Sequence, residues 1–271
     1  MLIKEFISID GQRIEEGFPL RSLFYGEGVF ETFRWKANPP VFWDRHLLRM
    51  KRGAGVLGIP FPGVGDIEWI IESAVSDSQI SDAYVKICLL SKGSSVFYEA
   101  PRGASILVVI RQYQSPNELI KAHISSLRRN STSPILRIKS LNYLENIIAR
   151  REARGLGFDE AVFLNERSEI TEGSASNIFW LKDGVLFTPS LECGLLSGVI
   201  RDVVIDIARE VGMGIEEGHF DLGSLASSRY AFFTNSLIGA IPISQIDGLR
   251  LQLDSPDFKK IKAILLERLL W

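Results

Sequence analysis

Lys139 lies in the stretch LRIKSLNYL, residues 136–144, where a predicted strand meets a predicted helix. Leu136 and Ile138 are apolar at alternate positions, which is typical of a buried strand; helical spacing then relates Leu141, Leu144, Ile147 and Ile148. A lysine at such a junction could simply extend its amine to solvent. Alternatively, a partly buried amine would have a lowered pKa and could attack an aldehyde carbon. Other stretches of the chain have to decide between these interpretations.

Three later stretches carry groups that could act with this amine. Glu172 precedes the small residues GSAS, which would let a flat ligand lie close to the backbone. In LLSGVIRDV a glycine opens a predicted helix, whose free N–H groups and positive dipole end suit a phosphate. Thr234, Asn235 and Ser236 place three hydrogen-bonding side chains after an apolar strand. Each stretch alone also has an ordinary interpretation, as a surface acid, a helix start or a polar loop.

In combination, and in this order, the four features match what pyridoxal 5′-phosphate needs. Its aldehyde requires an amine, and its pyridine nitrogen requires an acid that keeps it protonated and able to accept electrons. Its phosphate requires a helix start and hydroxyl groups. Because Glu172 follows Lys139 by 33 residues, with the helix start and the hydroxyls after it, the sequence predicts a site for this cofactor.

The elements that must position these groups can be read from hydrophobic periodicity. A hairpin is predicted near the N-terminus, turning at Asp10–Gly11. Further strands are predicted at residues 28–36, 83–91, 104–113, 159–166, 176–182 and 184–190 and as a pair within 230–243. Helices are predicted at residues 43–59, 66–77, 197–212 and 257–270, and from the lysine to about residue 155. Strands and helices are mixed without strict alternation, which predicts an α+β or irregular α/β fold.

The turn cluster Ser115-Pro116-Asn117 is the candidate linker between two parts. We therefore predict a smaller N-terminal α/β domain, residues 1–116, and a larger domain, residues 117–271, that carries the lysine. A chain of 271 residues is long enough for this division.

Composition limits the class of protein. Apolar residues make up 46% of the chain, charged residues 24%, and the formal net charge is −2, so nothing favours nucleic acid or an anionic membrane as a partner. No stretch resembles a signal peptide or a membrane span, which predicts a cytoplasmic protein. Cys88 and Cys193 are far apart and are expected to be reduced thiols. The three histidines are too scattered in sequence to predict a metal cluster.

The motifs resemble those of the class IV aminotransferase family, the fold-type IV pyridoxal-phosphate enzymes. The resemblance covers nearly the whole chain and rests on FYGEGVFETFR, DRHLLRM, IKSLNYLENIIARREA, DEAVFLNE, EITEGSASNIFW, TPSLECGLLSGVIR and TNSLIGAIP. It implies a two-domain fold with the cofactor in the cleft between the domains. It also implies a homodimer with the active site near the subunit interface.

The resemblance also implies a role for individual positions. Lys139 matches the lysine that bonds the cofactor aldehyde, and Glu172 matches the carboxylate that faces the pyridine nitrogen. The other matching positions are Arg49 and Ser236 (phosphate), Tyr143 (ring hydroxyl), Leu196 (beneath the ring), and Val199 and Ile200 (backbone N–H groups to the phosphate). The family usually has threonine where Ile200 stands, so we expect somewhat weaker phosphate binding here.

The substrate side is expected to involve the strand GVFETFRW. Phe30, Thr32 and Arg34 share one face of it at a period of two and, with Tyr25, are expected to line the substrate. Lys92 stands in LSKGSSVFYEAP, where D-amino-acid aminotransferases resemble one another in carrying arginine. Arg34 and Lys92 are the cations that we expect near substrate carboxylates.

Within the family, GVFETFR, SNIFWLKDG and especially TNSL look most like aminodeoxychorismate lyases. Those enzymes cleave 4-amino-4-deoxychorismate to 4-aminobenzoate and pyruvate, for folate-type cofactors. Lys139 is expected to move the proton, and Lys139 or a hydroxyl such as Thr32 to protonate the departing carbon. The alternatives are a branched-chain or D-amino-acid aminotransferase and, in another class, a non-catalytic pyridoxal-phosphate-binding protein.

Overall fold

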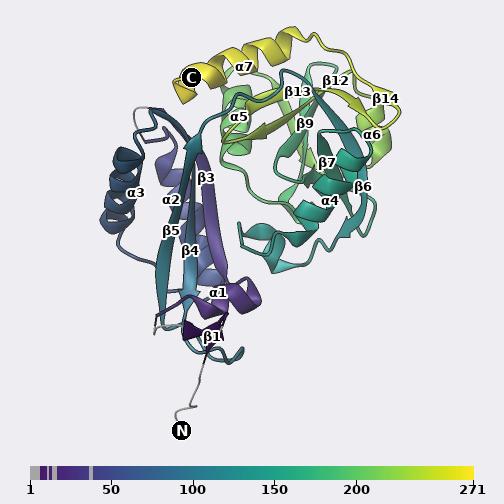
Figure 1. The fold of residues 1–271 in the computed structure, drawn as a ribbon. Coiled ribbons are helices and arrows are strands. Elements are labelled where there is room, and N and C mark those ends of the chain that lie inside the picture. The colour runs from purple at the N-terminus through teal and green to yellow at the C-terminus, as the bar shows by residue number, and fades with distance from the viewer. Residues whose placement is uncertain (1–6, 11, 14–16, 37–38) are drawn as a thin grey trace.

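The computed structural model describes residues 7–271 except residues 11, 14–16 and 37–38. Its elements form two bodies, each built on its own sheet (Figure 1). Near the N-terminus, β1 (Ser8–Ile9) pairs with β2 (Gln12–Arg13) in antiparallel orientation, as the predicted hairpin requires. Gly11, in the predicted turn, lies outside the described residues.

The smaller body is a three-stranded antiparallel sheet of β3 (Gly28–Lys36), β4 (Asp82–Lys92) and β5 (Gly103–Gln112). Helices α2 (Trp43–Val56) and α3 (Val64–Ser78) cover one face of it (Figure 1), and a short helix, α1 (Leu20–Tyr25), precedes it. Phe33, Met50, Ile67 and Val85 pack together in its core. Alternation along β3 places Phe33 in this core and turns its neighbours Thr32 and Arg34 to the other face.

The larger body contains a nine-stranded sheet in the order β11-β10-β9-β12-β13-β6-β7-β8, with β14 paired to β13. Its strands are β6 (Ile120–Arg129), β7 (Glu160–Asn165), β8 (Ile170–Gly173), β9 (Asn177–Lys182), β10 (Val185–Pro189), β11 (Gly214–Gly218), β12 (Tyr230–Asn235), β13 (Gly239–Ile246) and β14 (Leu249–Arg250). Three neighbouring pairs are parallel, namely β10–β11, β13–β6 and β6–β7, and the others are antiparallel.

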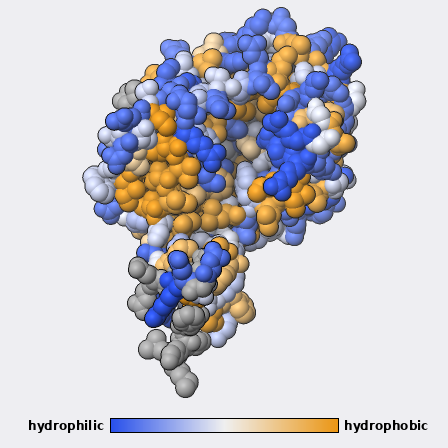
Figure 2. All heavy atoms as spheres, viewed as in Figure 1, coloured by the Kyte–Doolittle hydropathy of each residue, from blue (hydrophilic) through white to orange (hydrophobic). Residues whose placement is uncertain are grey.

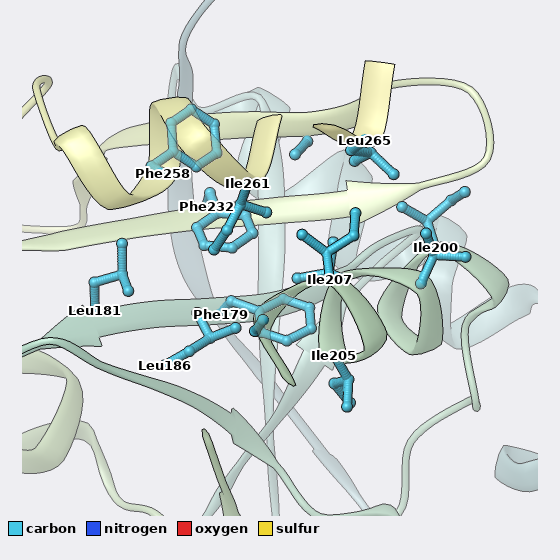
Figure 3. Packing of buried hydrophobic residues seen from close by; sticks show 14 of the residues in the cluster. Phe179, Leu181, Leu186, Ile200, Ile205, Ile207, Phe232, Phe258, Ile261 and Leu265 are labelled. Carbon is cyan, nitrogen blue, oxygen red and sulfur yellow. The ribbon is translucent and has the colours of Figure 1, made fainter. Parts of the chain in front are cut away.

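Helices pack on this sheet and complete its core. They are α4 (Leu144–Gly155), α5 (Val199–Glu210), α6 (Leu222–Ala226) and α7 (Pro256–Leu269). In Figure 3 the rings of Phe179 on β9 and Phe232 on β12 lie between α5 and α7, with Ile207 and Ile261 facing them. The stacked phenylalanine rings have centroids 5.2 Å apart. None of the described helices is long and apolar enough to cross a bilayer.

The two larger sheets, each with its own helices, confirm the predicted mixed fold with two bodies. The chain crosses between them in residues 113–119, which contain neither helix nor strand, and the predicted boundary between residues 116 and 117 lies in this segment.

Two details around the lysine differ from the sequence prediction. Residues Pro134–Arg137 form a short 3₁₀ helix rather than a buried strand, because Pro134 fixes φ at a helical value in the first turn. The following helix is confirmed, as α4, but its predicted apolar stripe faces solvent. Leu144 is 72% exposed and Ile148 52% exposed, whereas Ala149 and Ala153 are buried. Small side chains on this face allow α4 to lie close against β6 and β7.

Candidate active site

A cavity of about 250 Å³ lies between the two bodies. Its walls come from β3 and β4 of the smaller body and, in the larger one, from the segment leading into α4, the loop after β8, the start of α5 and the β12–β13 turn. Ten of the residues predicted from the sequence line it, namely Phe30, Thr32, Arg49, Lys139, Tyr143, Glu172, Leu196, Val199, Ile200 and Ser236.

The backbone of Lys139 is fixed to the smaller body. The carbonyl oxygen of Lys139 accepts a 2.8 Å hydrogen bond from Phe30 N, and Leu141 N donates to the carbonyl oxygen of Gly28 at 2.9 Å. Its amine therefore projects into the cavity, where Nζ lies 4.6 Å from the centroid of the Phe30 ring. Burial, and then the nearby Arg49 guanidinium, lower the pKa of Lys139 to about 8. About a tenth of the amine is thus neutral and nucleophilic at pH 7, far more than for a lysine of ordinary pKa.

Glu172 enters the cavity from the end of β8. Its Oε2 accepts a hydrogen bond from Leu196 N at 3.1 Å, and its Oε1 lies 3.9 Å from Nη2 of the buried Arg129. Burial raises the pKa of Glu172 to about 7, although Arg129 and the Leu196 N–H oppose the rise. A carboxyl group in this state could share a proton with a ring nitrogen.

Arg49 is held in place by the buried Glu31, which is itself bonded to the buried His46. Glu31 accepts from Arg49 Nε at 2.8 Å and from Nη2 at 2.6 Å, and the second Glu31 oxygen also lies 2.7 Å from His46 Nδ1. Burial alone would raise the pKa of Glu31, but Arg49 and His46 lower it to about 2. Arg49 Nη1 donates to the Ser197 carbonyl oxygen at 3.0 Å. A fixed guanidinium therefore stands directly beside the start of α5, where it can bind an anion.

The start of α5 is a cradle that requires glycine. A Cβ atom at Gly198 would lie only 1.9 Å from Asn177 Oδ1, although the φ of Gly198 is an ordinary −77°. Asn177 cannot retreat freely, because its Nδ2 donates to the Leu196 carbonyl oxygen at 2.9 Å. The first N–H groups of the helix, including those of Val199 and Ile200, have no partner within the helix, and both residues line the cavity.

Thr234 supplies an independent sign that the cavity takes a polar ligand. Its Oγ1 is buried and has no hydrogen-bond partner among the described residues, although the residue lines the cavity. Leaving a buried hydroxyl unpaired costs about 1–3 kcal/mol. The hydroxyl, the Arg49 guanidinium and the start of α5 together suit a phosphate, and Lys139 and Glu172 suit an aldehyde and a pyridine nitrogen. The residues present therefore fit pyridoxal 5′-phosphate.

The loop after β8 is fixed by a buried acid that sequence reasoning missed. Glu160 Oε2 accepts from Arg150 at 2.5 Å and from Ser176 Oγ at 3.1 Å, and its Oε1 accepts from Ser174 N at 3.1 Å. Tyr143 OH donates to the carbonyl oxygen of Ser174 at 3.1 Å. The loop that follows Glu172 and β8 is thus tied to β7 and to α4 and its N-terminal Tyr143. The one feature of the sequence that could have indicated Glu160 is its position as a charged residue at the start of a mostly apolar strand.

Three residues predicted for the substrate side do not line this cavity. Arg34 is paired with Asp82 through Nε at 2.7 Å and Nη2 at 2.6 Å, and its guanidinium lies 4.1 Å from the centroid of the Tyr113 ring. Tyr25 OH donates to the carbonyl oxygen of Ser95. Lys92 lies at the far end of β4, opposite Gly103.

Lys86 is a cation that sequence reasoning missed and that lines this cavity. It stands opposite Thr32 in the β3–β4 register, and its Nζ lies 4.2 Å from the centroid of the Phe30 ring. In the described part of the chain, Lys86 forms no ion pair with a carboxylate. Phe30 and Thr32 were predicted because alternate residues of a strand share one face. Lys86 lies on the same face of the neighbouring strand β4, but this requires knowledge of how β3 pairs with β4.

Comparison with known proteins identifies related chains. The family model for amino-transferase class IV matches residues 28–246. An aminodeoxychorismate lyase of Bacillus subtilis is 31% identical over 256 residues, which cover 89% of this chain and 86% of that protein.

Two solved structures have the same fold. One is a Legionella pneumophila protein described as a "Putative 4-amino-4-deoxychorismate lyase", which is 27% identical to this chain. The alignment covers 96% of this chain and 97% of that protein, and the TM-score is 0.88. The branched-chain aminotransferase of Thermoproteus uzoniensis, solved with norvaline, is 30% identical, with coverages of 94% and 91% and a TM-score of 0.83.

Proposed function

The chain belongs to the class IV aminotransferase family, and from this premise we propose that it is a pyridoxal-phosphate-dependent lyase. Its substrate is 4-amino-4-deoxychorismate, and its products are 4-aminobenzoate and pyruvate. The observation that carries the proposal is a cavity in which Lys139 and Glu172 face a hydroxyl, Thr32, and an unpaired cation, Lys86. The similarity to the Bacillus subtilis lyase supports the same choice.

Each group of the cavity has a task in this proposal. Arg49, the start of α5 and the Thr234 and Ser236 hydroxyls hold the phosphate. Tyr143 and Leu196 border the ring, and Glu172 keeps its nitrogen protonated. When bound, pyridoxal phosphate supplies an electron-accepting ring that stabilises negative charge on the carbon next to the substrate amine.

Lys139 moves the proton. Its neutral amine takes the proton from the carbon that bears the substrate amine, and the bond from the neighbouring ring carbon to the enolpyruvyl oxygen then breaks. Lys139 or Thr32 returns a proton to the methylene carbon of the departing enolpyruvate, which becomes pyruvate. One proton is removed and one is added, the six-membered ring becomes aromatic, and no keto-acid co-substrate is consumed.

Lys86 binds a carboxylate of the substrate in this proposal, in place of the predicted Arg34 and Lys92. A charge-assisted contact of this kind is worth about 1.5–3 kcal/mol. Lys86→Met should therefore raise KM for aminodeoxychorismate by roughly 10- to 150-fold with a smaller effect on kcat. Lys182→Met, an exposed lysine on β9, is the matched control and should leave KM unchanged.

The deciding experiment compares two reactions of the purified protein. Aminodeoxychorismate alone should yield equal amounts of 4-aminobenzoate and pyruvate, and Lys139→Ala should yield neither. Amino-group exchange between branched-chain or D-amino acids and a 2-oxo acid, without 4-aminobenzoate, would replace the lyase by an aminotransferase. A protein that binds the cofactor but performs neither reaction would be a non-catalytic binder.

We also propose that the protein works as a homodimer. Leu144 and Ile148 on α4 and Phe24 on α1 are more than half exposed, and Figure 2 shows apolar side chains gathered over the smaller sheet, where Leu107 is 46% exposed. Apolar surface of this kind is commonly covered by a partner. Light scattering should give twice the mass of the 30.4 kDa chain, and a monomer at micromolar concentration would contradict the proposal.

A further inference from the structure

Three metal-binding side chains from separate segments meet outside the cavity. Glu169 lies just before β8, Cys193 ends the 3₁₀ helix Leu191–Cys193, and His219 follows β11. Glu169 Oε1 is 3.2 Å from His219 Nδ1, and Cys193 Sγ is 3.5 Å from the same nitrogen. The three donor atoms all lie within 4.8 Å of one another. None of these residues lines the candidate active site.

These separations fit a tetrahedral zinc ion. Zinc binds imidazole nitrogen and carboxylate oxygen at about 2.0–2.1 Å and thiolate sulfur at about 2.3 Å. At tetrahedral angles, neighbouring ligand atoms are then roughly 3.3–3.6 Å apart. The observed 3.2 and 3.5 Å match those two edges closely. The combination of thiolate, imidazole and carboxylate also selects zinc over magnesium or calcium, which prefer oxygen ligands alone.

The groups around the three donors support the same assignment. His219 Nε2 lies 3.3 Å from Glu192 Oε2, which is the carboxylate–histidine pair that orients an imidazole toward a metal. Glu169 Oε2 accepts from Asn165 Nδ2 at 2.6 Å and from Arg167 at 2.8 Å, which leaves Oε1 directed at His219. The charge of Arg167 opposes a nearby cation, but Arg167 is also paired with Glu166 at 2.8 Å.

A fourth ligand can reach this place from solvent. The His219 side chain is 44% exposed, and a surface hollow lined by Arg137, Arg167, Glu192 and His219 adjoins it. Cys193, in contrast, is fully buried. Water can therefore approach from the histidine side while the sulfur stays protected from it.

We propose that Glu169, Cys193 and His219 bind one zinc ion, with water as the fourth ligand. On binding, the Cys193 thiol loses its proton to solvent and the S–H bond is replaced by an S–Zn bond. The ion would connect the two segments that hold Glu172, because Glu169 precedes Glu172 by three residues and Cys193 precedes Leu196 by three. Zinc binding at this place is independent of the reaction that the cavity catalyses.

The thiol is otherwise unreactive. Burial, together with the Glu169 carboxylate, raises the pKa of Cys193 to about 11, so without a metal its sulfur stays protonated at neutral pH. Metal binding at neutral pH should therefore release the Cys193 thiol proton and any proton held by His219, whose pKa the Glu169 and Glu192 carboxylates raise, and calorimetry in buffers of different ionisation enthalpy can measure this release.

The experiment uses untagged holoenzyme and zinc, with cadmium as the spectroscopic probe. After dialysis against micromolar zinc, elemental analysis should find about one zinc per chain. Cadmium should produce a thiolate charge-transfer band in the ultraviolet difference spectrum. Both signals should be lost in Cys193→Ser and His219→Gln and retained in Cys88→Ser, the matched control, whose side chain is buried on β4 of the smaller body. Glu192→Gln should weaken zinc binding about 10- to 100-fold.

A fold defect is distinguished by thermal melting. Zinc should raise the Tm of the wild-type protein and of Cys88→Ser but not that of His219→Gln, whose own melt must remain cooperative. Zinc content that is unchanged in Cys193→Ser, or a wild-type protein without the cadmium–thiolate band, would overturn the proposal.

Discussion

Among the individual residues, Lys139 has the most distinctive environment. Its amine is shielded from water and lies near the Arg49 guanidinium, and both effects favour the neutral form. Only that form attacks an aldehyde, so the rate at which cofactor-free protein takes up pyridoxal phosphate should rise with pH and level off above about 8. Stopped-flow absorbance across the pH range measures this rate.

The variant Arg49→Met tests whether the Arg49 charge lowers the pKa of Lys139. Removing the neighbouring positive charge should raise the pKa of Lys139 and move the midpoint of the uptake profile to higher pH, besides weakening cofactor affinity. A midpoint that moved to lower pH, or a wild-type rate that did not change with pH, would show that this account of the amine is wrong.

The unpaired Thr234 hydroxyl leads to a second prediction. Thr234→Val should weaken cofactor binding by about 2- to 13-fold, which corresponds to the roughly 0.5–1.5 kcal/mol of one hydrogen bond. Thr188→Val is the control, because its hydroxyl donates to the carbonyl oxygen of Ile178 at 2.9 Å within the same sheet. Equilibrium titration should show that this variant keeps its cofactor affinity; equal losses in the two variants would point to a general weakening of the sheet.

At this scale, residue types and order predicted ten of the residues that line the cavity, but strand alternation alone also selected Arg34, which does not line it. Arg34 does share the face of Phe30 and Thr32, yet it lies further along β3, where Asp82 and Tyr113 bind it. Asp82 is 48 positions away in sequence, and Lys86 becomes a neighbour of Thr32 only through the β3–β4 register. Local patterns carry no information on either pairing.

Among the elements, the start of α5 depends most on one residue. In Gly198→Ala the new methyl group would overlap Asn177 Oδ1, so Asn177 or the first turn of α5 must shift. We expect a loss of about 1–3 kcal/mol in the free energy of unfolding and at least tenfold weaker cofactor binding. Gly155→Ala, at the end of α4, has open space around its Cβ, so it should not destabilise the protein and could add up to about 1 kcal/mol to the free energy of unfolding. Urea unfolding measures the stability and cofactor titration measures the affinity. Normal cofactor affinity in Gly198→Ala would contradict the proposal that the start of α5 binds the cofactor.

The extent of the regular elements was largely predictable, whereas their buried faces were not. The strand at residues 28–36 has the predicted bounds, and α2 and α3 differ from prediction by a few residues at their ends. In α4, however, periodicity identified the helix and not its orientation, because Leu144 and Ile148 face outward while alanines face β6 and β7. Before Lys139 a strand was predicted, but residues Pro134–Arg137 form a 3₁₀ helix, because Pro134 in its first turn favours helical φ.

In the whole molecule, residues of both bodies line the cavity. A ligand bound there should therefore raise the stability of both bodies together. The bodies are joined by the Phe30–Lys139 and Gly28–Leu141 backbone hydrogen bonds and by the bond from Arg49 to Ser197. Pyridoxal phosphate at a hundred times its Kd should stabilise the protein by about 2.7 kcal/mol. Calorimetry should show one transition that moves upward as a unit, and less so in Lys139→Ala. Two transitions, of which only one responds, would mean that the bodies unfold independently.

The hydrogen bonds that tie Lys139 to β3 have a consequence for recombination between homologous genes. Lys139 belongs to the second half of the chain by sequence, but its backbone is registered on a strand of the first half. A chimera joined within residues 113–119 would bring in a foreign β3 beneath the native lysine and so displace the amine relative to Glu172. Residues 138–141 should therefore be inherited together with residues 28–30, whichever parent supplies the remainder.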